Sequence, residues 1–491
     1  MTDHSDASKL AASSLKWTSA IEILSRTASP IVFIALAALL PPSDFGLLGI
    51  ATVAVSFMQI FIDNGLGRAL IQFKADAVPI EAVANATFWV NAGLSVVLYA
   101  LVFLLAPAFA QHFKEPALVS IIRVLGVQVI VASFASVQQA LLQRDFAFKR
   151  LLAVKFASAF VPGVISVVLA LQGYGVWSLV IGALAMAVVN SAAIWVACSW
   201  KPSLRFIWHD VMPILHFGMW TLVEALASWF IFWGDTLVVA NFLGVEQVGL
   251  YRVACNIALV LFTVMLNPLN TILYPYLSVL QKDNAALRDV FSKLNRLVTA
   301  IAIPAGLGVL LLAPATVPLV LQTRWTGLGI VLGLVSLREG ISRLAGINPE
   351  LYRAIGRPDI NVRIIFITVA FYMPVYLLAA PFGLFVFVIA RIVVTIAGLF
   401  VHAVYTSRLL GVDRLYLLYD SRRVVFACVV MGAAVLLCEV GFVALGLNAY
   451  LSLAAIVAIG VGVYGYMMWK LDPDLTTLAA RLMSKATSLR A

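Results

Sequence analysis

The chain is a succession of long apolar blocks separated by short polar stretches. A membrane-spanning helix needs about 20 predominantly apolar residues, and fourteen blocks reach or approach that length. This pattern predicts an all-α, polytopic membrane protein with about 14 transmembrane helices. The predicted spans are residues 17–40, 46–66, 82–107, 118–141, 152–171, 174–198, 213–241, 249–272, 295–314, 327–348, 363–380, 383–406, 424–446 and 449–469.

The tenth block, residues 327–348, is the weakest candidate because it contains several charged and hydroxyl side chains. The distribution of basic residues tests whether it crosses. With a cytoplasmic N-terminus and fourteen spans, 25 Lys and Arg fall in cytoplasmic segments and only Lys114 and Arg324 in outer loops. Basic residues collect on the cytoplasmic side of membranes, so this split favours fourteen spans with both termini cytoplasmic. The longest connection is the cytoplasmic one around residues 273–294.

Composition narrows the class of protein. Hydrophobic residues make up 63% of the 491 positions and charged residues 11%, with a mean hydropathy of +1.03. Soluble domains are about half apolar and about a quarter charged, which excludes a soluble enzyme, a disordered chain and a nucleic-acid-binding domain. The net charge of +10 reflects the cytoplasmic loops. The polar N-terminus does not have the pattern of a cleaved signal peptide, and the four cysteines show no paired spacing that predicts disulfides or a metal site.

Two segments 203 residues apart indicate an internal repeat. LLPPSDFGLLGIA (39–51) and FLGVEQVGLYRVA (242–254) both close a long span and open the next. The offset equals six spans, so we expect two six-helix pseudo-repeat lobes in the same orientation, followed by two additional helices. Parallel repeats are a transporter architecture with the substrate site between the halves. The expected division is 1–208 for the N-terminal lobe, 209–410 for the C-terminal lobe, and 411–491 for helices 13–14 and a cytoplasmic tail.

Twelve charged side chains fall inside predicted spans. Each costs roughly 3 kcal/mol at the centre of a lipid-facing helix, so these residues must face one another or a water-filled cavity. The six basic ones are all arginine: Arg26, Arg123, Arg252, Arg338, Arg343 and Arg391. The six acids are Glu22, Asp63, Glu224, Asp235, Glu339 and Glu439.

Pairing within a helix is the simpler interpretation for part of this set. Glu22 with Arg26, and Glu339 with Arg343, have the i,i+4 spacing of neighbouring side chains on one helix face. The remaining residues near span ends have other simple roles: Asp63 can be hydrated, and Arg123 and Arg252 can extend their long side chains to the interface.

The functional interpretation depends on the arginines as a group. Arg338 and Arg391 lie well inside their spans and have no partner at helical spacing. Arginine keeps its charge, and its planar guanidinium matches phosphate oxygens. The six arginines therefore predict a cationic cavity for an anionic substrate such as a diphosphate.

Three acids are candidates for ion coupling, because unpaired carboxylates in membranes often bind protons or sodium. They are Asp235, Glu224 and Glu22. For Asp235 the alternative is an ion pair with Arg252. The mid-span Trp229 and Trp233 are interpreted first as core packing and second as platforms for sugar rings. No phosphate-binding Walker loop, hydrolase triad or metal motif is present in the sequence, so neither catalytic residues nor a cofactor are expected.

Three segments resemble a known family. They are DFGLLGIATVAVSFMQIFIDNGLGRALIQ near the start, GDTLVVANFLGVEQVGLYRVA at the lobe boundary, and LNPLNTILYPYLSVLQKD after it. With the 6+6+2 plan, the chain resembles Wzx-type oligosaccharide flippases, which share a superfamily with multidrug and toxin extrusion transporters and the lipid II flippase. The resemblance covers nearly the whole chain and is greatest to the branch of colanic-acid and succinoglycan exporters.

This resemblance implies a function. The expected substrate is an oligosaccharide on undecaprenyl diphosphate, flipped across the bacterial inner membrane for exopolysaccharide or lipopolysaccharide biosynthesis. Transport would proceed by alternating access, with proton or sodium coupling and no chemistry on the substrate. Expected partners are the lipid-linked oligosaccharide, membrane lipids, a polysaccharide polymerase and a chain-length regulator, without nucleic acid. Helices 13–14 would either form a lipid groove or only pack against the lobe.

Three other functions fit part of the pattern. An ion-coupled drug or metabolite exporter would share the fold, but it favours an acidic or aromatic cavity. A membrane glycosyltransferase, polymerase or ligase normally needs a large outer loop or paired carboxylates at the membrane surface, and the loops here are short. A channel agrees less well with the internal repeat and the scattered ion pairs.

Overall fold

The computed structural model describes residues 30–63, 70, 79–145, 147–204, 207, 212–281, 283–321, 323–357, 359–445, 448–475 and 477. All regular secondary structure within these residues is helical, which confirms the predicted all-α class. The helices are α2 (Pro42–Asp63), α4 (Ile80–His112), α5 (Ala117–Arg144), α6 (Phe148–Leu171), α7 (Val176–Ala197), α8 (Met212–Leu243), α9 (Val245–Val279), α10 (Asn284–Leu321), α11 (Leu328–Ser342), α12 (Asn348–Ala354), α13 (Asp359–Ala379), α14 (Leu384–Leu410), α15 (Tyr416–Ala444) and α16 (Ala449–Leu471).

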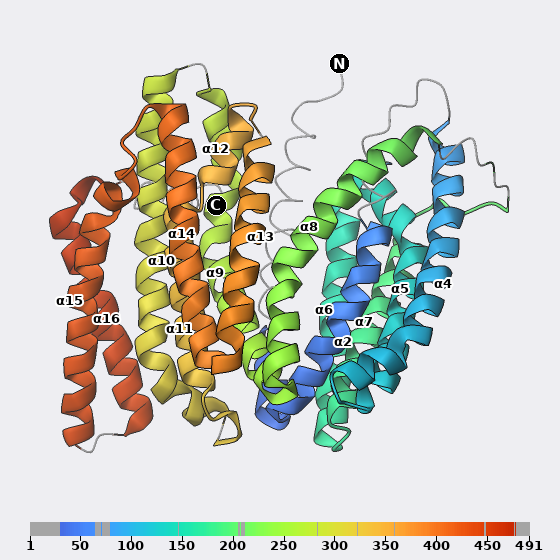
Figure 1. Ribbon diagram of the computed structural model, residues 1–491, viewed down its shortest axis with the longest axis horizontal. Coiled ribbons are helices and arrows are strands. Elements are labelled where there is room, and N and C mark those ends of the chain that lie inside the picture. The colour runs from blue at the N-terminus through green and yellow to red at the C-terminus, as the bar shows by residue number, and fades with distance from the viewer. Residues whose placement is uncertain are drawn as a thin grey trace, which may run out of the picture. The chain divides into compact units, whose positions relative to one another are not determined.

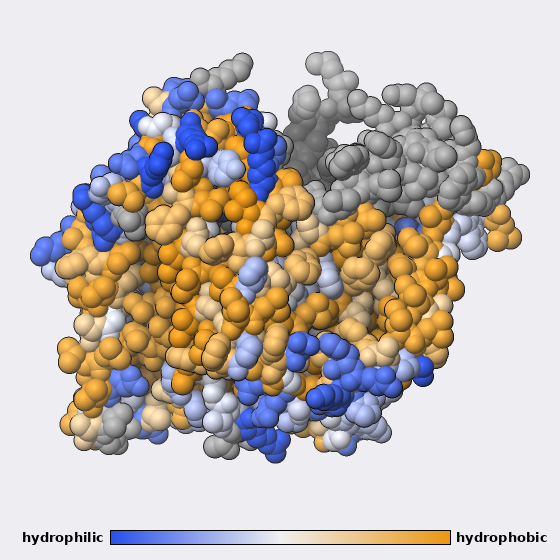
Figure 2. Space-filling view, in the orientation of Figure 1, coloured by the Kyte–Doolittle hydropathy of each residue, from blue (hydrophilic) through white to orange (hydrophobic). Residues whose placement is uncertain are grey.

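Twelve of the described helices are long and apolar enough to cross a membrane. In Figure 2 apolar residues cover the middle of these helices, and hydrophilic residues gather near their ends. Two of the fourteen predicted spans are not among the twelve. The first is described only from Pro30 to Leu39, as a short apolar helix. The tenth corresponds to α11, which has 15 residues and a length of about 22 Å.

The tenth span is short because the helix is interrupted rather than continued. After α11 the backbone tightens into a 3-10 turn, Arg343–Ala345, and a new helix, α12, begins with Pro349 in its first turn. Proline is favoured at the start of a helix and cannot donate the backbone bond that would continue the preceding one.

The cytoplasmic connection expected around residues 273–294 is mostly helical, which corrects the predicted loop. α9 continues to Val279 and α10 begins at Asn284. The span prediction recognised only the apolar parts of these two helices, because their polar ends extend beyond an apolar block.

Two compact units divide the chain, residues 1–252 and 253–491, and the boundary lies within α9. In unit 1, α5 packs against α2, α4, α6 and α7, while α8 packs against α2 (Figure 1). Gly244, with φ of +82°, forms the single-residue turn from α8 to α9. A residue with a side chain is strained in this left-handed conformation.

The two segments that indicated an internal repeat contact each other within unit 1. A Cβ added to Gly46 of α2 would overlap the carbonyl oxygen of Val245, and one added to Gly249 of α9 would overlap the carbonyl oxygen of Pro42. Gly46 and Gly249 are related by the 203-residue offset, and so are Pro42 and Val245. The contact is therefore reciprocal, and glycine permits this close approach of the two helix starts.

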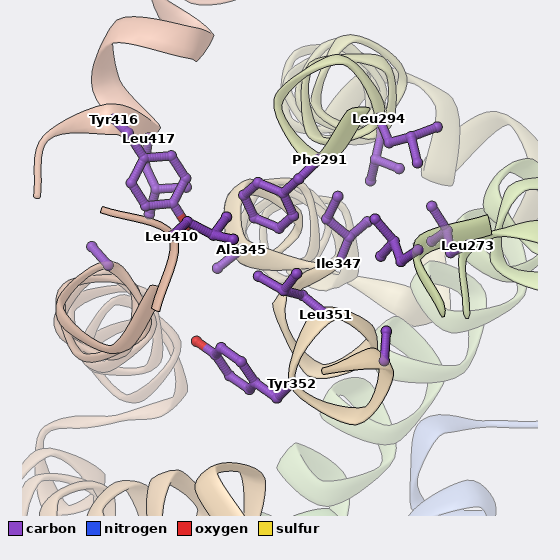
Figure 3. Close-up of a cluster of buried hydrophobic side chains, with 14 of the residues drawn as sticks. Leu273, Phe291, Leu294, Ala345, Ile347, Leu351, Tyr352, Leu410, Tyr416 and Leu417 are labelled. Atoms are coloured by element: carbon purple, nitrogen blue, oxygen red, sulfur yellow. The ribbon is translucent and has the colours of Figure 1, made fainter. Parts of the chain in front are cut away.

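Unit 2 has its own core, built from α9, α10, α12, α14 and the start of α15. Phe291, Leu351 and Tyr352 are almost completely buried there (Figure 3). A polar network closes the cluster: Asn348 donates to Thr406 at 2.9 Å and to Tyr416 at 3.0 Å. Burial raises the pKa of Tyr416 to about 12, so its hydroxyl stays neutral and available for these bonds at physiological pH.

The additional helices α15 and α16 pack against α10. Met431 and Val435 of α15 and Ile456 of α16 form an apolar cluster with side chains of α10. Beyond α16, the nearly buried carboxylate of Asp472 pairs with Arg296 of α10 at 3.2 Å and with Arg423 of α15 at 3.5 Å. This ion-pair triad fastens the end of α16 to both neighbouring helices.

Gly249→Ala should destabilise the protein by about 2 kcal/mol, because an inserted methyl group in a tight contact typically costs 1–3 kcal/mol. Thermal unfolding of the purified protein in detergent would measure this change. Gly308→Ala is the matched control, since no atom lies within 4 Å of a Cβ at that position of α10. If both variants unfold at the wild-type temperature, the close helix approach is not a stability determinant.

Candidate functional site

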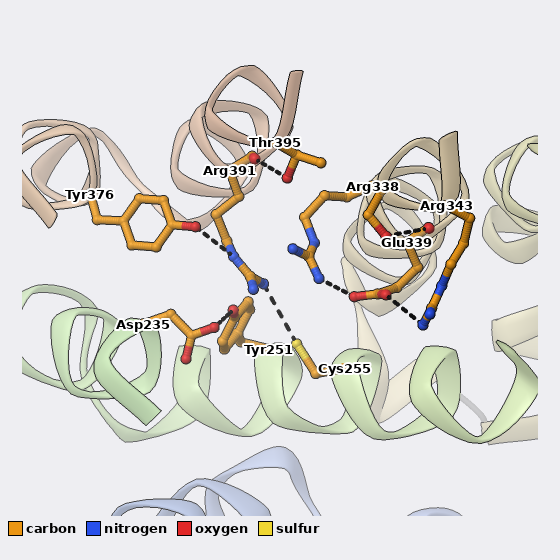
Figure 4. A network of polar contacts seen from close by, with 10 residues as sticks. Asp235, Tyr251, Cys255, Arg338, Glu339, Arg343, Tyr376, Arg391 and Thr395 are labelled. Carbon is orange, nitrogen blue, oxygen red and sulfur yellow. Dashed lines mark hydrogen bonds and ion pairs between the residues drawn. The ribbon is translucent and has the colours of Figure 1, made fainter. Parts of the chain in front are cut away.

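Two of the predicted site arginines surround one carboxylate on α11. Arg338 and Arg343 both form ion pairs with Glu339, the latter at 3.8 Å (Figure 4). The i,i+4 pair of Glu339 with Arg343 is thus confirmed. Arg338 has no partner at helical spacing, as the sequence indicates, but it pairs with the adjacent Glu339. Spacing rules miss such a pair, since neighbouring side chains on a helix normally diverge.

Arg391 of α14 is a third arginine near this carboxylate. Its side chain is 7% exposed. Nε donates to the hydroxyl of Tyr376 on α13 at 3.4 Å, and Nη1 approaches Sγ of Cys255 on α9 at 3.9 Å (Figure 4). Its positive charge acts on Glu339 together with those of Arg338 and Arg343. Tyr376 and Cys255 gave no signal in the sequence, because they lie far along the chain from Arg391.

We define the arginine cluster as Arg338, Arg343, Arg391 and the central Glu339. Two guanidinium groups share the carboxylate of Glu339, and a third, that of Arg391, lies close to them. The Nε atoms of Arg338 and Arg343 are buried and have no acceptor within the described part of the chain. A buried donor without a partner is costly, and an anion with several oxygens would satisfy both the charge and these donors.

Two of the predicted arginines, Arg123 and Arg252, lie over aromatic rings of unit 1. The Arg252 guanidinium lies 4.2 Å from the ring centroid of Trp233 and 5.7 Å from that of Phe232. Arg123 lies 4.0 Å from the centroid of Phe103 and donates from Nε to its backbone oxygen at 3.3 Å. Such cation–π contacts stabilise a charge without a carboxylate. These two arginines therefore have structural partners within their own unit.

Three predicted residues cannot be placed in the site. Arg26 and Glu22 lie outside the described residues, and the side chain of Glu224, on α8, is not described either. Their assignment as a substrate-binding arginine and as coupling acids stays a prediction.

Asp235 of α8 is buried, with 5% of its surface exposed. Its carboxylate accepts hydrogen bonds from the Tyr251 hydroxyl at 2.5 Å and from the backbone N–H and hydroxyl of Thr236 at 2.6 and 3.1 Å (Figure 4). Tyr251 was not foreseen as a partner. Three donors from two residues therefore hold this carboxylate in place within unit 1.

Trp229 of α8 packs within unit 1, as the first interpretation of this residue predicts. Its indole N–H donates to the hydroxyl of Ser56 at 2.9 Å, and its ring meets the ring of Phe57 edge-on at 5.2 Å. Both aromatic residues line an apolar cavity of about 210 Å³. An apolar wall with one satisfied N–H indicates packing rather than sugar binding.

Comparison with known proteins finds relatives in polysaccharide biosynthesis. The sequence profile of a family described as polysaccharide biosynthesis protein matches residues 35–329. The chain is 28% identical over 360 residues to the lipopolysaccharide biosynthesis protein WzxC of Escherichia coli, which covers 72% of this chain and 71% of that protein. It is 24% identical over 306 residues to the succinoglycan biosynthesis transport protein ExoT of Rhizobium meliloti, with coverage of 62% and 61%.

Solved structures share the fold. The lipid II flippase MurJ in an inward closed conformation superposes with a TM-score of 0.74 over 94% of this chain and 99% of that one, at 13% identity. An inward-facing multidrug transporter of the MATE family gives a TM-score of 0.59 over 79% and 96%, at 15% identity. At these identities the likeness concerns the fold alone, and it confirms the predicted polytopic architecture.

Glu339→Gln should destabilise the protein by about 2 kcal/mol, because it removes two charged contacts from partly buried arginines. Thermal unfolding and protein abundance in membranes would measure this effect. The control is Glu350→Gln, whose partner Arg353 is 54% exposed and whose loss should cost below about 1 kcal/mol. Equal effects of the two changes would contradict the electrostatic role of Glu339.

Proposed function

The chain belongs to the polysaccharide biosynthesis protein family, and we propose that it flips undecaprenyl-diphosphate-linked oligosaccharides across the bacterial inner membrane. It is a multi-pass membrane protein and a transporter rather than an enzyme. The diphosphate of such a carrier matches the chemistry of the arginine cluster.

The observation that carries this proposal is the gathering of three arginines around Glu339. A diphosphate presents several oxygens and more than one negative charge, and guanidinium groups bind such oxygens in pairs. Arg338, Arg343 and Arg391 place three such groups close together. A cationic drug would be repelled by the same cluster, so an exporter of cations is disfavoured.

In this mechanism the arginine cluster binds the diphosphate from the cytoplasmic leaflet and releases it on the outer side. Glu339 holds Arg338 and Arg343 in place through its ion pairs when the site is empty. Alternating access of two six-helix lobes, residues 1–208 and 209–410, exposes the site to each side in turn. Both termini lie in the cytoplasm in this scheme. A polymerase on the outer side, with its chain-length regulator, would then consume the product.

Arg338→Gln or Arg391→Gln should reduce polymer export at least about tenfold, since one charged hydrogen bond is worth roughly 1.5–3 kcal/mol. Protein abundance should stay normal, because Glu339 keeps two of its arginine neighbours in each variant. The variants would be expressed in a strain in which the native gene is deleted, and extracellular polymer would be measured.

Sealed inner-membrane vesicles from the same strains distinguish flipping from later steps. We expect lipid-linked oligosaccharide to accumulate on the cytoplasmic leaflet in the deletion strain and in both variants. The control is Arg363→Gln, an exposed ion-pair partner of Asp359, which should export normally. Arrival of the lipid-linked unit at the outer leaflet in the deletion strain would exclude the flippase function and direct attention to efflux of other solutes.

Asp235→Asn should weaken transport and remove its dependence on the proton or sodium gradient if Asp235 couples ions. Asparagine keeps one accepting oxygen for the Thr236 donors and presents its N–H2 group to the Tyr251 hydroxyl, but it cannot carry the charge. Export measured across pH and sodium concentration would report this change, with the exposed Asp289→Asn as control. Unchanged pH and sodium dependence would reduce Asp235 to a structural acid.

A further inference from the structure

A polar pocket lies within unit 1, and none of the site residues named above lines it. Its volume is about 320 Å³, and its walls come from α2, α5, α6 and α7. Alanines and Met186 form much of its lining. The polar lining side chains are Gln59, Gln128, Lys155, Ser158 and Asn190. We call this site the amide pocket.

Lys155 gives the amide pocket a positive charge. The charge count groups this lysine with the cytoplasmic basic residues, at the edge of the predicted span 152–171; in the structure it is an exposed residue seven positions inside α6, about 10 Å from the helix start at Phe148. No acid lines the pocket. The ammonium group has no ion-pair or hydrogen-bond partner among the described residues, so water or a bound anion must solvate it.

Three amide side chains reach the same pocket from three different helices. Ser158 Oγ lies 2.8 Å from the backbone oxygen of Val154 and 3.3 Å from Oδ1 of Asn190. In the described part of the chain, the amides of Gln59 and Gln128 make no side-chain hydrogen bond to protein. A carboxamide has both donors and an acceptor, and it therefore matches a hydroxyl group, which also donates and accepts.

The size and charge of the pocket limit what it can bind. Ligand pockets range over roughly 300–1,000 Å³, so this one accommodates a single ring rather than an oligosaccharide. A diphosphate would need more positive charge than one lysine, which acts as a point charge without the paired geometry of arginine. A metal cation is disfavoured by the ammonium group. A ring with several hydroxyls and one carboxylate matches all the polar groups present.

We propose that the amide pocket binds one acidic sugar residue of the transported saccharide, with its carboxylate on Lys155 and its hydroxyls on Gln59, Gln128 and Asn190. The proposal rests on the flippase function for its physiological ligand. It gives unit 1 a role in selecting the saccharide, while the arginine cluster of unit 2 binds the diphosphate.

Binding to the purified full-length protein in lipid nanodiscs tests this directly. Isothermal titration would compare glucuronate with glucose, acetate and inorganic pyrophosphate. Glucuronate should bind more tightly than glucose and acetate, because only glucuronate has both the carboxylate and the ring hydroxyls. Equal binding of glucose or of acetate would overturn the acidic-sugar assignment. Tighter binding of pyrophosphate that depends on Lys155 would make the pocket a phosphate site instead.

Lys155→Gln should weaken glucuronate binding about tenfold or more, the loss expected for one charged hydrogen bond, and should leave glucose binding unchanged. Lys155→Arg keeps the charge and should retain the preference. Gln128→Glu introduces a carboxylate beside the lysine and should abolish it without removing any side chain. The matched control is Lys149→Gln, an exposed lysine at the start of the same helix. Wild-type glucuronate affinity in both Lys155→Gln and Gln128→Glu would refute the proposal.

These experiments test the flippase function and the acidic-sugar site separately. If flipping is absent in the vesicle assay while Lys155-dependent glucuronate binding persists, the flippase function is wrong and the pocket is still an acidic-sugar site. If flipping occurs but glucuronate does not bind, the pocket assignment is wrong and the function of the arginine cluster stands.

Discussion

A charge surrounded by apolar helices is stable only beside an opposite charge, a hydrogen-bonding group, an aromatic face or water, and this constraint organises both units. Arg123 and Arg252 lie over aromatic rings, and the carboxylate of Asp235 is bonded by a tyrosine hydroxyl. For each of these charged groups, the named partner belongs to the same unit. In the arginine cluster two arginines share one carboxylate, and Lys155 is an exposed lysine in a pocket whose lining contains no acid. Both places present positive charge that suits a negatively charged substrate.

The helices were predictable because their signal is a length of apolar sequence, which does not depend on neighbours. The limits of α9 and α10 were not predictable in the same way, since their polar ends remain helical without being apolar. The break after α11 follows from Pro349 and from a cluster of charges that interrupts the apolar pattern. Chain pattern thus gives the number and order of the helices, while their ends depend on the contacts made there.

The candidate sites were predictable only in part, because a site joins residues that the sequence keeps apart. The arginines could be recognised from the sequence because a charged side chain within a span has a high free-energy cost. Their partners Tyr376 and Cys255 did not, since an aromatic residue or a cysteine in an apolar block needs no explanation. Lys155 was counted with the cytoplasmic basic residues because it follows Lys149 and Arg150 closely along the chain. Amides such as Gln128 carry little weight in a hydropathy pattern, yet three of them meet in space.

The reciprocal packing of Gly46 and Gly249 bears on the ancestry of the chain. A contact in which each partner plays the same role is what a two-fold axis creates between identical subunits. A half-length precursor with one such helix start would have bound its own copy through this surface, and gene duplication with fusion would turn a homodimer interface into an internal contact. A homodimer must carry every charged group twice. Fusion removes that requirement, so that each half can acquire charged and polar side chains that the other half lacks.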